Sequence, residues 1–350
     1  MRVVILGYYG FGNAGDEALL LSLLQMLPEH YQPCVLSDQP QVTAATYPVL
    51  SASRWSLPEL WRLLGAADLF VWGGGSLLQD RSSWRSPLYY LAVMTMAQQR
   101  GVRTLAWAQG IGPLDRPWNR AWTRACLAGC QGVSVRDQAA AQLLEGWGIP
   151  YQLAPDPVWA LQGLADPAGV DWPEGGIAVV LRTHPHLTPA RLAVIRTALQ
   201  RLQAKTEAPL FFVPFQLAAP HAPPSPDQQL AEQLQAQLPN PSHLLLLRDP
   251  RYLKGFLGKM RLTITMRYHG LVMAAAEGCR CFAVSYDPKV RHLLTALDMP
   301  GWDLEELPGE ADSIQEAWLH HYYEGSPLSW EERQTWASQA EQHRQVLLDA

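Results

Sequence analysis

The chain has 350 residues, of which 48% are hydrophobic and 17% are charged, and this composition is typical of a globular protein with room for two domains. A formal net charge of -5 gives no reason to expect nucleic-acid binding, and no apolar run approaches the roughly 18 residues of a transmembrane helix. The five cysteines lack zinc-ligand spacing. The first strand begins at residue 2, which leaves no room for a signal peptide. Both features favour a cytoplasmic protein.

Apolar strands and helical stretches alternate along the first half of the chain. Strands are predicted over residues 3–6, 34–38, 47–52, 69–72, 103–110 and 132–137, and a last strand ends at Ala154. Helices are predicted over 17–27, 57–68, 86–101 and 117–130, with one more before the last strand. Repeated alternation of this kind predicts a parallel sheet with helices on both faces.

A segment rich in proline and glycine, residues 155–176, reads as a linker, and the alternation then starts again. Strands are predicted over 177–182, 210–215, 243–247, 261–266 and 281–287, and helices over 189–205, 227–237, 252–258, 271–278 and 290–298. We therefore expect an α/β protein of two doubly wound, Rossmann-like domains that face a cleft, one over 1–165 and one over 166–328. A polar helix within 329–350 is expected to pack back on the first domain.

The loop "GYYGFGNAGDEALL" (7–20) follows the first strand, and its glycines fall in the dinucleotide spacing G-x-G-x-x-G, with Asp38 about 20 residues on. Two tyrosines lengthen the turn before this spacing begins, and Asp16 and Glu17 would repel a pyrophosphate at the helix start. A plain glycine turn with a capped helix is the structural alternative. We favour a pocket for sugar hydroxyls, lined by Gly12, Asn13, Asp16 and Glu17 and by Gly74 and Gly75 of a second strand-end loop.

Basic residues lie at or just after the ends of several predicted strands of both halves. Arg136 and Arg182 follow strands, Arg267 and His269 are predicted to end one, and Lys289 begins the helix after another. Any one of them can be a solvated surface charge. As a set they are placed at the carboxyl ends of strands, where ligands bind in doubly wound sheets. Because arginine pairs with carboxylate and phosphate, and lysine binds phosphate as a point charge, the set predicts a small, multiply charged anion.

The same loops together resemble the polysaccharide pyruvyl transferase family, most closely its bacterial cell-wall-polymer branch (CsaB-type). The resemblance rests on "GYYGFGNAGDEALL", "VWGGGSLLQD", "AWAQGIGPL", "SVRD", "TMRYHGLVMAAAEG" and "SYDPKV", which span residues 3 to about 293 in the family's order. It implies a fold like that of GT-B glycosyltransferases. It also implies transfer of pyruvate from phosphoenolpyruvate to two hydroxyls of a sugar as a ketal, with release of phosphate. The implied acceptor is N-acetylmannosamine of a lipid-linked saccharide, used at the inner face of the membrane.

The resemblance assigns phosphoenolpyruvate binding to Arg136, Arg182, Arg267, His269 and Lys289. His269 is the candidate proton donor, and Asp16 or Glu17 is the candidate base. We expect no metal and no cofactor beyond the donor substrate, since the sequence has no cluster with ligand spacing. Trp84 and Trp107 are candidates for stacking on a sugar, with burial in the core as the alternative. The competing functions are a GT-B glycosyltransferase that uses a nucleotide sugar and a non-catalytic sugar- or anion-binding protein.

Overall fold

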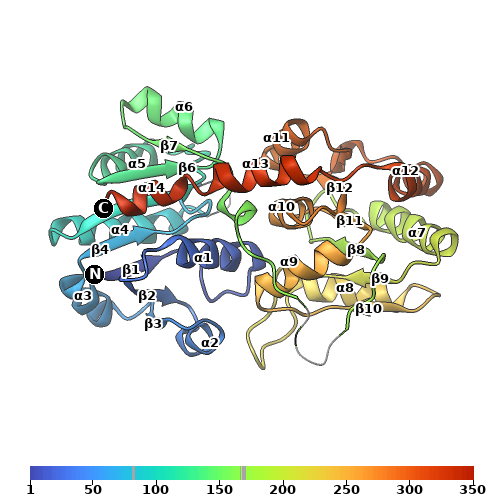
Figure 1. The fold of residues 1–350 in the computed structure, drawn as a ribbon, viewed down its shortest axis with the longest axis horizontal. Coiled ribbons are helices and arrows are strands. Elements are labelled where there is room, and N and C mark those ends of the chain that lie inside the picture. The colour runs from blue at the N-terminus through green and yellow to red at the C-terminus, as the bar shows by residue number, and fades with distance from the viewer. Residues whose placement is uncertain (81–82, 166, 168–170) are drawn as a thin grey trace. The chain divides into compact units, whose positions relative to one another are not determined.

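The structure, a computed structural model, describes residues 1–80, 83–165, 167 and 171–350. The contacts within the chain divide it into two compact units (Figure 1). Unit 1 comprises Met1–Phe11, Asp16–Leu161 and Thr335–Ala350, and unit 2 comprises Gly12–Gly15 and Gln162–Gln334. Four residues of the first glycine-rich loop therefore belong to unit 2, although the residues on either side of them belong to unit 1.

Unit 1 is built on a seven-stranded parallel sheet with the order β3-β2-β1-β4-β5-β6-β7. Its strands are β1 (Arg2–Leu6), β2 (Gln32–Ser37), β3 (Leu50–Ser53), β4 (Leu69–Trp72), β5 (Arg103–Gln109), β6 (Gly132–Val135) and β7 (Gln152–Leu153). The chain order reverses between the neighbours β1 and β4. The loops that follow these two strands therefore meet at the topological switch point, where ligands bind in such sheets.

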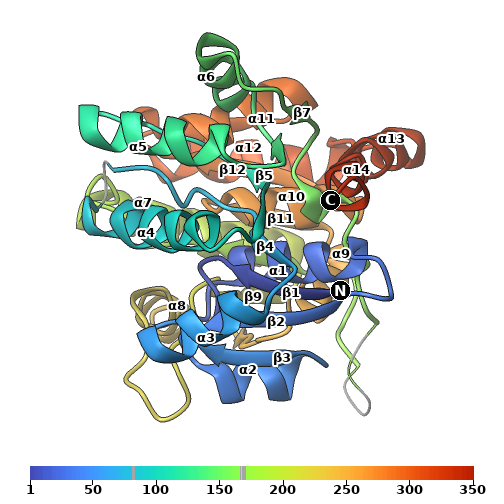
Figure 2. The same ribbon diagram turned by 90° about the vertical axis from the view of Figure 1, so that its left-hand side faces the viewer.

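Helices cover both faces of this sheet (Figure 2). They are α1 (Ala14–Met26), α2 (Pro40–Thr46), α3 (Leu57–Ala66), α4 (Arg85–Gln99), α5 (Pro117–Ala128), α6 (Gln138–Trp147), a 3₁₀ turn (Pro157–Trp159) and α14 (His343–Leu348). Alternate strand residues face opposite sides. Val4 and Phe70 share a buried core with Leu64 of α3 and Met94 of α4, whereas Trp107 contacts α14 on the other face.

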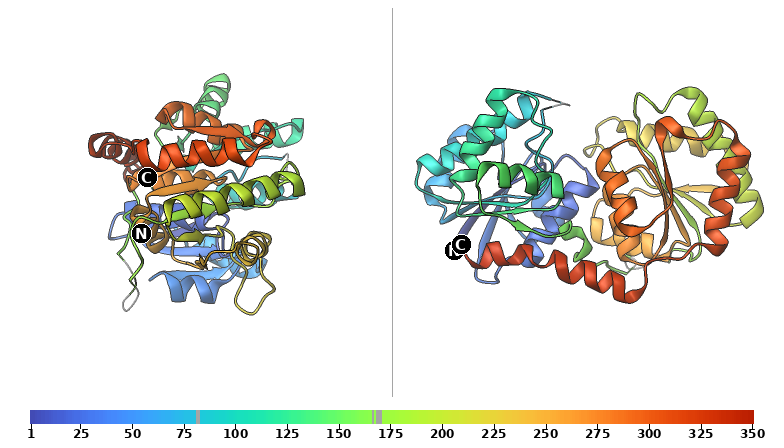
Figure 3. Two further views of the ribbon diagram at one scale, coloured as in Figure 1. Left: turned by 90° about the vertical axis from the view of Figure 1, so that its right-hand side faces the viewer. Right: turned by 90° about the horizontal axis from the view of Figure 1, so that it is seen from above.

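Unit 2 repeats the design with a six-stranded parallel sheet of order β10-β9-β8-β11-β12-β13 (Figure 3). Its strands are β8 (Ile177–Val180), β9 (Leu210–Phe212), β10 (Ser242–Leu244), β11 (Leu262–Thr265), β12 (Arg280–Ser285) and β13 (Gly301–Asp303). Its helices are α7 (Pro189–Thr206), α8 (Pro226–Ala236), α9 (Pro250–Lys259), α10 (Tyr268–Ala276), α11 (Pro288–Leu297), a 3₁₀ turn (Leu304–Glu306) and α12 (Ala311–Glu324). The switch point lies between β8 and β11.

The predicted fold class is confirmed, since both units are doubly wound Rossmann-like α/β structures. Several elements differ from the prediction. The polar C-terminal helix is two helices, α13 (Trp330–Ala340) and α14, and the predicted strand over 47–52 is β3 at Leu50–Ser53. Helix α2 was missed because only Thr43 of its residues is buried, which leaves no apolar period. Helix α12 was missed although Ile314, Trp318 and Tyr322 recur every four residues on its buried side.

Candidate active site

Two of the predicted basic residues flank the switch point of unit 2. Arg182 follows β8 and Arg267 follows β11, and these strands are neighbours in the sheet. The backbone N–H of Arg267 donates to Oγ1 of Thr265 over 3.0 Å, and α10 begins at Tyr268, directly after this turn. His269 is therefore in the first turn of a helix. The prediction that Arg267 and His269 end a strand is wrong, because β11 stops at Thr265 and the chain turns into α10.

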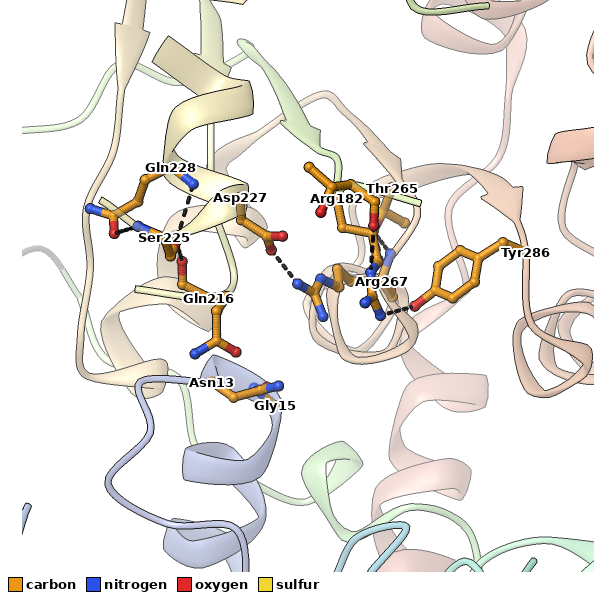
Figure 4. Close-up of polar contacts among 11 residues, drawn as sticks. Asn13, Gly15, Arg182, Gln216, Ser225, Asp227, Gln228, Thr265, Arg267 and Tyr286 are labelled. Carbon is orange, nitrogen blue, oxygen red and sulfur yellow. Dashed lines mark hydrogen bonds and ion pairs between the residues drawn. The ribbon is translucent and has the colours of Figure 1, made fainter. Parts of the chain in front are cut away.

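Arg267 is held by a carboxylate that the sequence analysis did not single out. Its Nη2 donates to Oδ2 of Asp227 on α8, and both side chains are largely buried, with 14% and 4% exposed (Figure 4). Nε of Arg267 has no partner among the described residues. Asp227 is placed by the start of α8, where Ser225 and Gln228 form a reciprocal capping box. The sequence "SPDQ" carried this capping signal, but nothing in it pointed to Arg267.

Arg182 is oriented by Tyr286, which follows β12. Nη1 of Arg182 donates to the Tyr286 hydroxyl over 2.8 Å, and the guanidinium carbon lies 5.0 Å from the centre of the same ring. Lys289 is in the first turn of α11, where Asp287 accepts its backbone N–H over 2.9 Å. Four of the five residues predicted to bind phosphoenolpyruvate, Arg182, Arg267, His269 and Lys289, thus follow the adjacent strands β8, β11 and β12 of one unit.

Within unit 2, the tip of the first glycine-rich loop, Gly12–Gly15, pairs with the backbone around Gln216 and lies against His269. The backbone N–H of Ala14 donates to Phe215 O and that of Leu217 to Gly12 O, each over 2.8 Å. These bonds extend the isolated antiparallel bridge between Asn13 and Gln216, residues that lie side by side in Figure 4.

Two glycines of this tip have no room for a side chain. Gly12 has a φ of 71°, and a Cβ there would lie 2.2 Å from the carbonyl oxygen of Leu217. A Cβ on Gly15 would lie 2.2 Å from Nδ1 of His269. A side chain is thus excluded at Gly15, where the loop backbone lies against the His269 imidazole. Gly12 and Asn13, both predicted to bind the acceptor, belong to the same loop tip.

The other predicted acceptor residues belong to unit 1. Glu17 is 6% exposed, and its carboxylate accepts the Gly10 N–H over 2.8 Å and the Tyr47 hydroxyl over 3.3 Å. Burial raises the pKa of Glu17 from 4.5 to about 7. Asp16 is half-buried, and its Oδ1 lies 3.4 Å from the position that a Cβ of Gly75 would take. Gly74 and Gly75 belong to the loop after β4, and Asp16 belongs to the loop and helix after β1. Asp16 therefore meets this glycine loop at the switch point between β1 and β4.

Arg136 also belongs to unit 1 and is not part of the group in unit 2. It follows β6 and pairs with Asp156 over 2.5 Å, with side chains that are 6% and 0% exposed. Its Nη2 donates to Oγ of Ser76 over 3.4 Å. A pair this buried orders the loop after β4, and the role of Arg136 in anion binding stays a prediction.

Of the two tryptophans weighed for stacking on a sugar, Trp107 is in the core, where its Nε1 donates to the backbone oxygen of His343 over 3.1 Å. Trp84 is 48% exposed. Across residues 1–80, 83–165, 167 and 171–350, no three His, Cys, Asp or Glu side chains are arranged to hold a metal ion. Within the same residues no helix combines the length and the apolar character needed to cross a membrane.

Known proteins resemble this chain in two ways, in sequence family and in fold. The model of the polysaccharide pyruvyl transferase family matches residues 13–288, which is well over half of the chain. No curated protein matches the chain in sequence.

Among solved structures, the UDP-GlcNAc 2-epimerase of Methanocaldococcus jannaschii is 10% identical, with a TM-score of 0.66 and coverage of 100% of both chains. The Neisseria meningitidis UDP-GlcNAc 2-epimerase bound to UDP-GlcNAc is 11% identical, with a TM-score of 0.60 over 100% of this chain and 99% of that one. The spinosyn forosaminyltransferase SpnP is 13% identical, with a TM-score of 0.51 over 99% and 95%. At these identities the likeness establishes the GT-B fold alone.

Proposed function

Because this chain belongs to the polysaccharide pyruvyl transferase family, we propose that it converts phosphoenolpyruvate and a sugar diol into a cyclic pyruvate ketal and phosphate. In this reaction the bond from C2 to the phosphate oxygen breaks, and two bonds from C2 to sugar oxygens form. One hydroxyl proton balances the proton gained by the methylene carbon, and the other leaves with the phosphate. The acceptor we propose is N-acetylmannosamine of a lipid-linked cell-wall saccharide.

The observation that supports this proposal most directly is the cationic group that follows the neighbouring strands β8, β11 and β12 of unit 2, together with His269 in the first turn of α10. Arg182, Arg267 and Lys289 supply the charges that a substrate with one carboxylate and one phosphate requires. The guanidinium groups of Arg182 and Arg267 are already oriented by Tyr286 and Asp227. Preorganised cations of this kind stabilise the charge that develops on the leaving phosphate.

His269 is the proton donor to the methylene carbon in this proposal. The backbone of Gly15 covers the Nδ1 edge of the ring, so we assign proton delivery to Nε2. Protonation of the methylene carbon leaves an oxocarbenium-like centre at C2, which a sugar hydroxyl attacks. A general acid in this role contributes about 10²–10⁴-fold to the rate.

The base that accepts the hydroxyl proton is Asp16 in this proposal. Its carboxylate lies beside Gly75 and is half-buried, whereas Glu17 is only 6% exposed and burial favours its neutral form. Two variants separate the candidates. Asp16→Asn should lower turnover by about 10²-fold, and Glu17→Gln should stay within a few-fold of wild type. The opposite pattern would transfer the role to Glu17.

The function is tested by measuring phosphate released from phosphoenolpyruvate in the presence of a panel of N-acetylhexosamines and their oligosaccharides. Mass spectrometry of the acceptor should show one pyruvate per molecule, and mild acid should remove it as a ketal. A glycosyl product from a nucleotide sugar, with no phosphate from phosphoenolpyruvate, would support a GT-B glycosyltransferase instead. Binding of both ligands without any phosphate release would support a non-catalytic protein.

A further inference from the structure

Four aromatic rings gather beyond the strands of the unit 1 sheet: Tyr8 and Phe11 follow β1, Trp55 follows β3, and Tyr89 belongs to α4. Tyr8 stacks on Phe11 with a centroid distance of 4.2 Å and an interplanar angle of 13°. Trp55 lies against Tyr89 of α4 at 5.2 Å. Trp55 is 57% exposed and Tyr8 is 36% exposed, so these two rings present a face to solvent. We call these four residues the Trp55 platform.

A buried arginine holds the platform from below. Arg54 is 2% exposed, and its guanidinium carbon lies 4.7 Å from the centre of the Tyr89 ring, 5.0 Å from that of Trp55 and 5.1 Å from that of Phe11. Its Nη1 donates to the backbone oxygen of Gly7 over 2.8 Å.

No carboxylate pairs with Arg54 within the part of the chain that the structure describes, and its Nε has no hydrogen-bond partner there. Burying such a charge lowers stability. What the protein gains is a set of rings fixed by cation–π contacts from one cation. The packing of a hydrophobic core does not require a buried cation without a carboxylate partner. A cation of this kind beneath exposed rings therefore points to a surface that is preorganised for a ligand.

Carboxylates accompany the rings. Oδ1 of Asp38 accepts the indole N–H of Trp55 over 2.7 Å, which fixes the orientation of the indole ring. Burial raises the pKa of the Tyr8 hydroxyl, and the charge of Asp16 raises it further, whereas the charge of Arg54 lowers it. Aromatic faces stack on the C–H face of a pyranose, and carboxylate oxygens accept its hydroxyl protons. The same carboxylates disfavour an anionic ligand such as a nucleotide.

We propose that the Trp55 platform binds a sugar ring of the acceptor other than the ring that receives pyruvate. This inference rests on the proposed function, in which the reacting ring lies beside Asp16 and Gly75. In the order β3-β2-β1-β4, Tyr8 and Phe11 follow β1, the strand next to β4, whereas the indole of Trp55 is bonded to Asp38 after β2. The platform therefore begins beside the place of the reacting ring and extends away from Gly75 over more than one strand. A ring that stacks on Trp55 is thus a second ring of the acceptor, so the acceptor has two or more rings.

The test measures binding by isothermal titration without phosphoenolpyruvate. The probes are N-acetylmannosamine and the di- and trisaccharides that end in it, with UDP as the nucleotide probe. The proteins are wild type, Trp55→Ala, Trp55→Phe and the control Trp61→Ala, since Trp61 on α3 is also 54% exposed and stacks on Arg100 instead. Thermal unfolding verifies that each variant is folded.

For wild type and Trp61→Ala, we expect the longer probes to bind at least about tenfold more tightly than the monosaccharide. Trp55→Ala should lose this gain and Trp55→Phe, which keeps a stacking face, should retain most of it. A gain that survives Trp55→Ala, equal affinity for all lengths, no saccharide binding, or UDP binding that depends on Trp55 would each overturn the proposal. Saccharide binding that depends on Trp55, without release of phosphate from phosphoenolpyruvate, would refute only the proposed function. Turnover that depends neither on the acceptor length nor on Trp55 would refute only the proposed role of the platform.

Discussion

Glu17 makes a prediction about stability that follows from its burial. Its carboxyl group is 6% exposed, and burial raises its pKa from 4.5 to about 7. The folded protein therefore keeps a proton on Glu17 between these two pH values while the unfolded chain releases it. Because the folded state then binds more protons at Glu17, the contribution of this group to stability falls as the pH rises from 4.5 to about 7. The pKa change corresponds to about 3 kcal/mol, an order-of-magnitude figure.

Glu17→Gln removes this dependence, because the amide is neutral and its oxygen can still accept the Gly10 N–H. The difference in free energy of unfolding between Glu17→Gln and wild type should be near zero at pH 4.5 and grow to about 3 kcal/mol in favour of the variant above pH 7. Urea denaturation at several pH values measures it, with the exposed Glu29→Gln as the matched control. A difference that does not change with pH, or a variant less stable than wild type at pH 8, would refute the reasoning.

Four further outcomes are expected. Arg267→Lys should weaken phosphoenolpyruvate binding by about 1.5–3 kcal/mol, measured by titration calorimetry on a variant whose circular dichroism shows that it is folded. His269→Gln should lower turnover by about 10²-fold with donor affinity retained; turnover within a few-fold of wild type would make His269 only a ligand. Gly15→Ala should lower turnover strongly because a Cβ would lie 2.2 Å from Nδ1 of His269, whereas Gly146→Ala, with open space around it, should not. Burial lowers the pKa of His343 from 6.5 to about 4, so the free energy of unfolding of wild type relative to His343→Gln should fall by about 3 kcal/mol as the pH falls across this range; parallel pH profiles of the two proteins would contradict this.

Most of the fold could be predicted from the sequence because apolar runs alternate with helical stretches. The runs "VVIL" and "LFVW" belong to central strands buried on both faces, and these were placed correctly. The missed helices have other causes. Helix α2 buries only Thr43, so its formation depends on the strands it connects, whereas α12 carried a periodic signal at Ile314 and Trp318 that was overlooked.

The candidate site could be predicted only as far as strand ends determine it. Arg182 and Arg267 were placed at one sheet edge because each follows an apolar run, and parallel strands share a carboxyl edge. The pairing of Arg267 with Asp227 joins residues 40 positions apart, and no local pattern encodes it. The contact between Gly15 and His269 likewise depends on packing between distant segments, as does the position of Arg54 beneath three rings of the Trp55 platform.

The most direct test of ketal formation is to run the reaction in heavy water and follow both products. With phosphoenolpyruvate and an oligosaccharide that ends in N-acetylmannosamine, we expect one phosphate for each ketal and one deuterium in the pyruvyl methyl group, because the methylene carbon must gain a proton from a solvent-exchanged donor. His269→Gln should slow both signals together. A folded wild-type protein that releases no phosphate from phosphoenolpyruvate with any acceptor of the panel, or a ketal whose methyl group carries no deuterium, would contradict the proposed reaction.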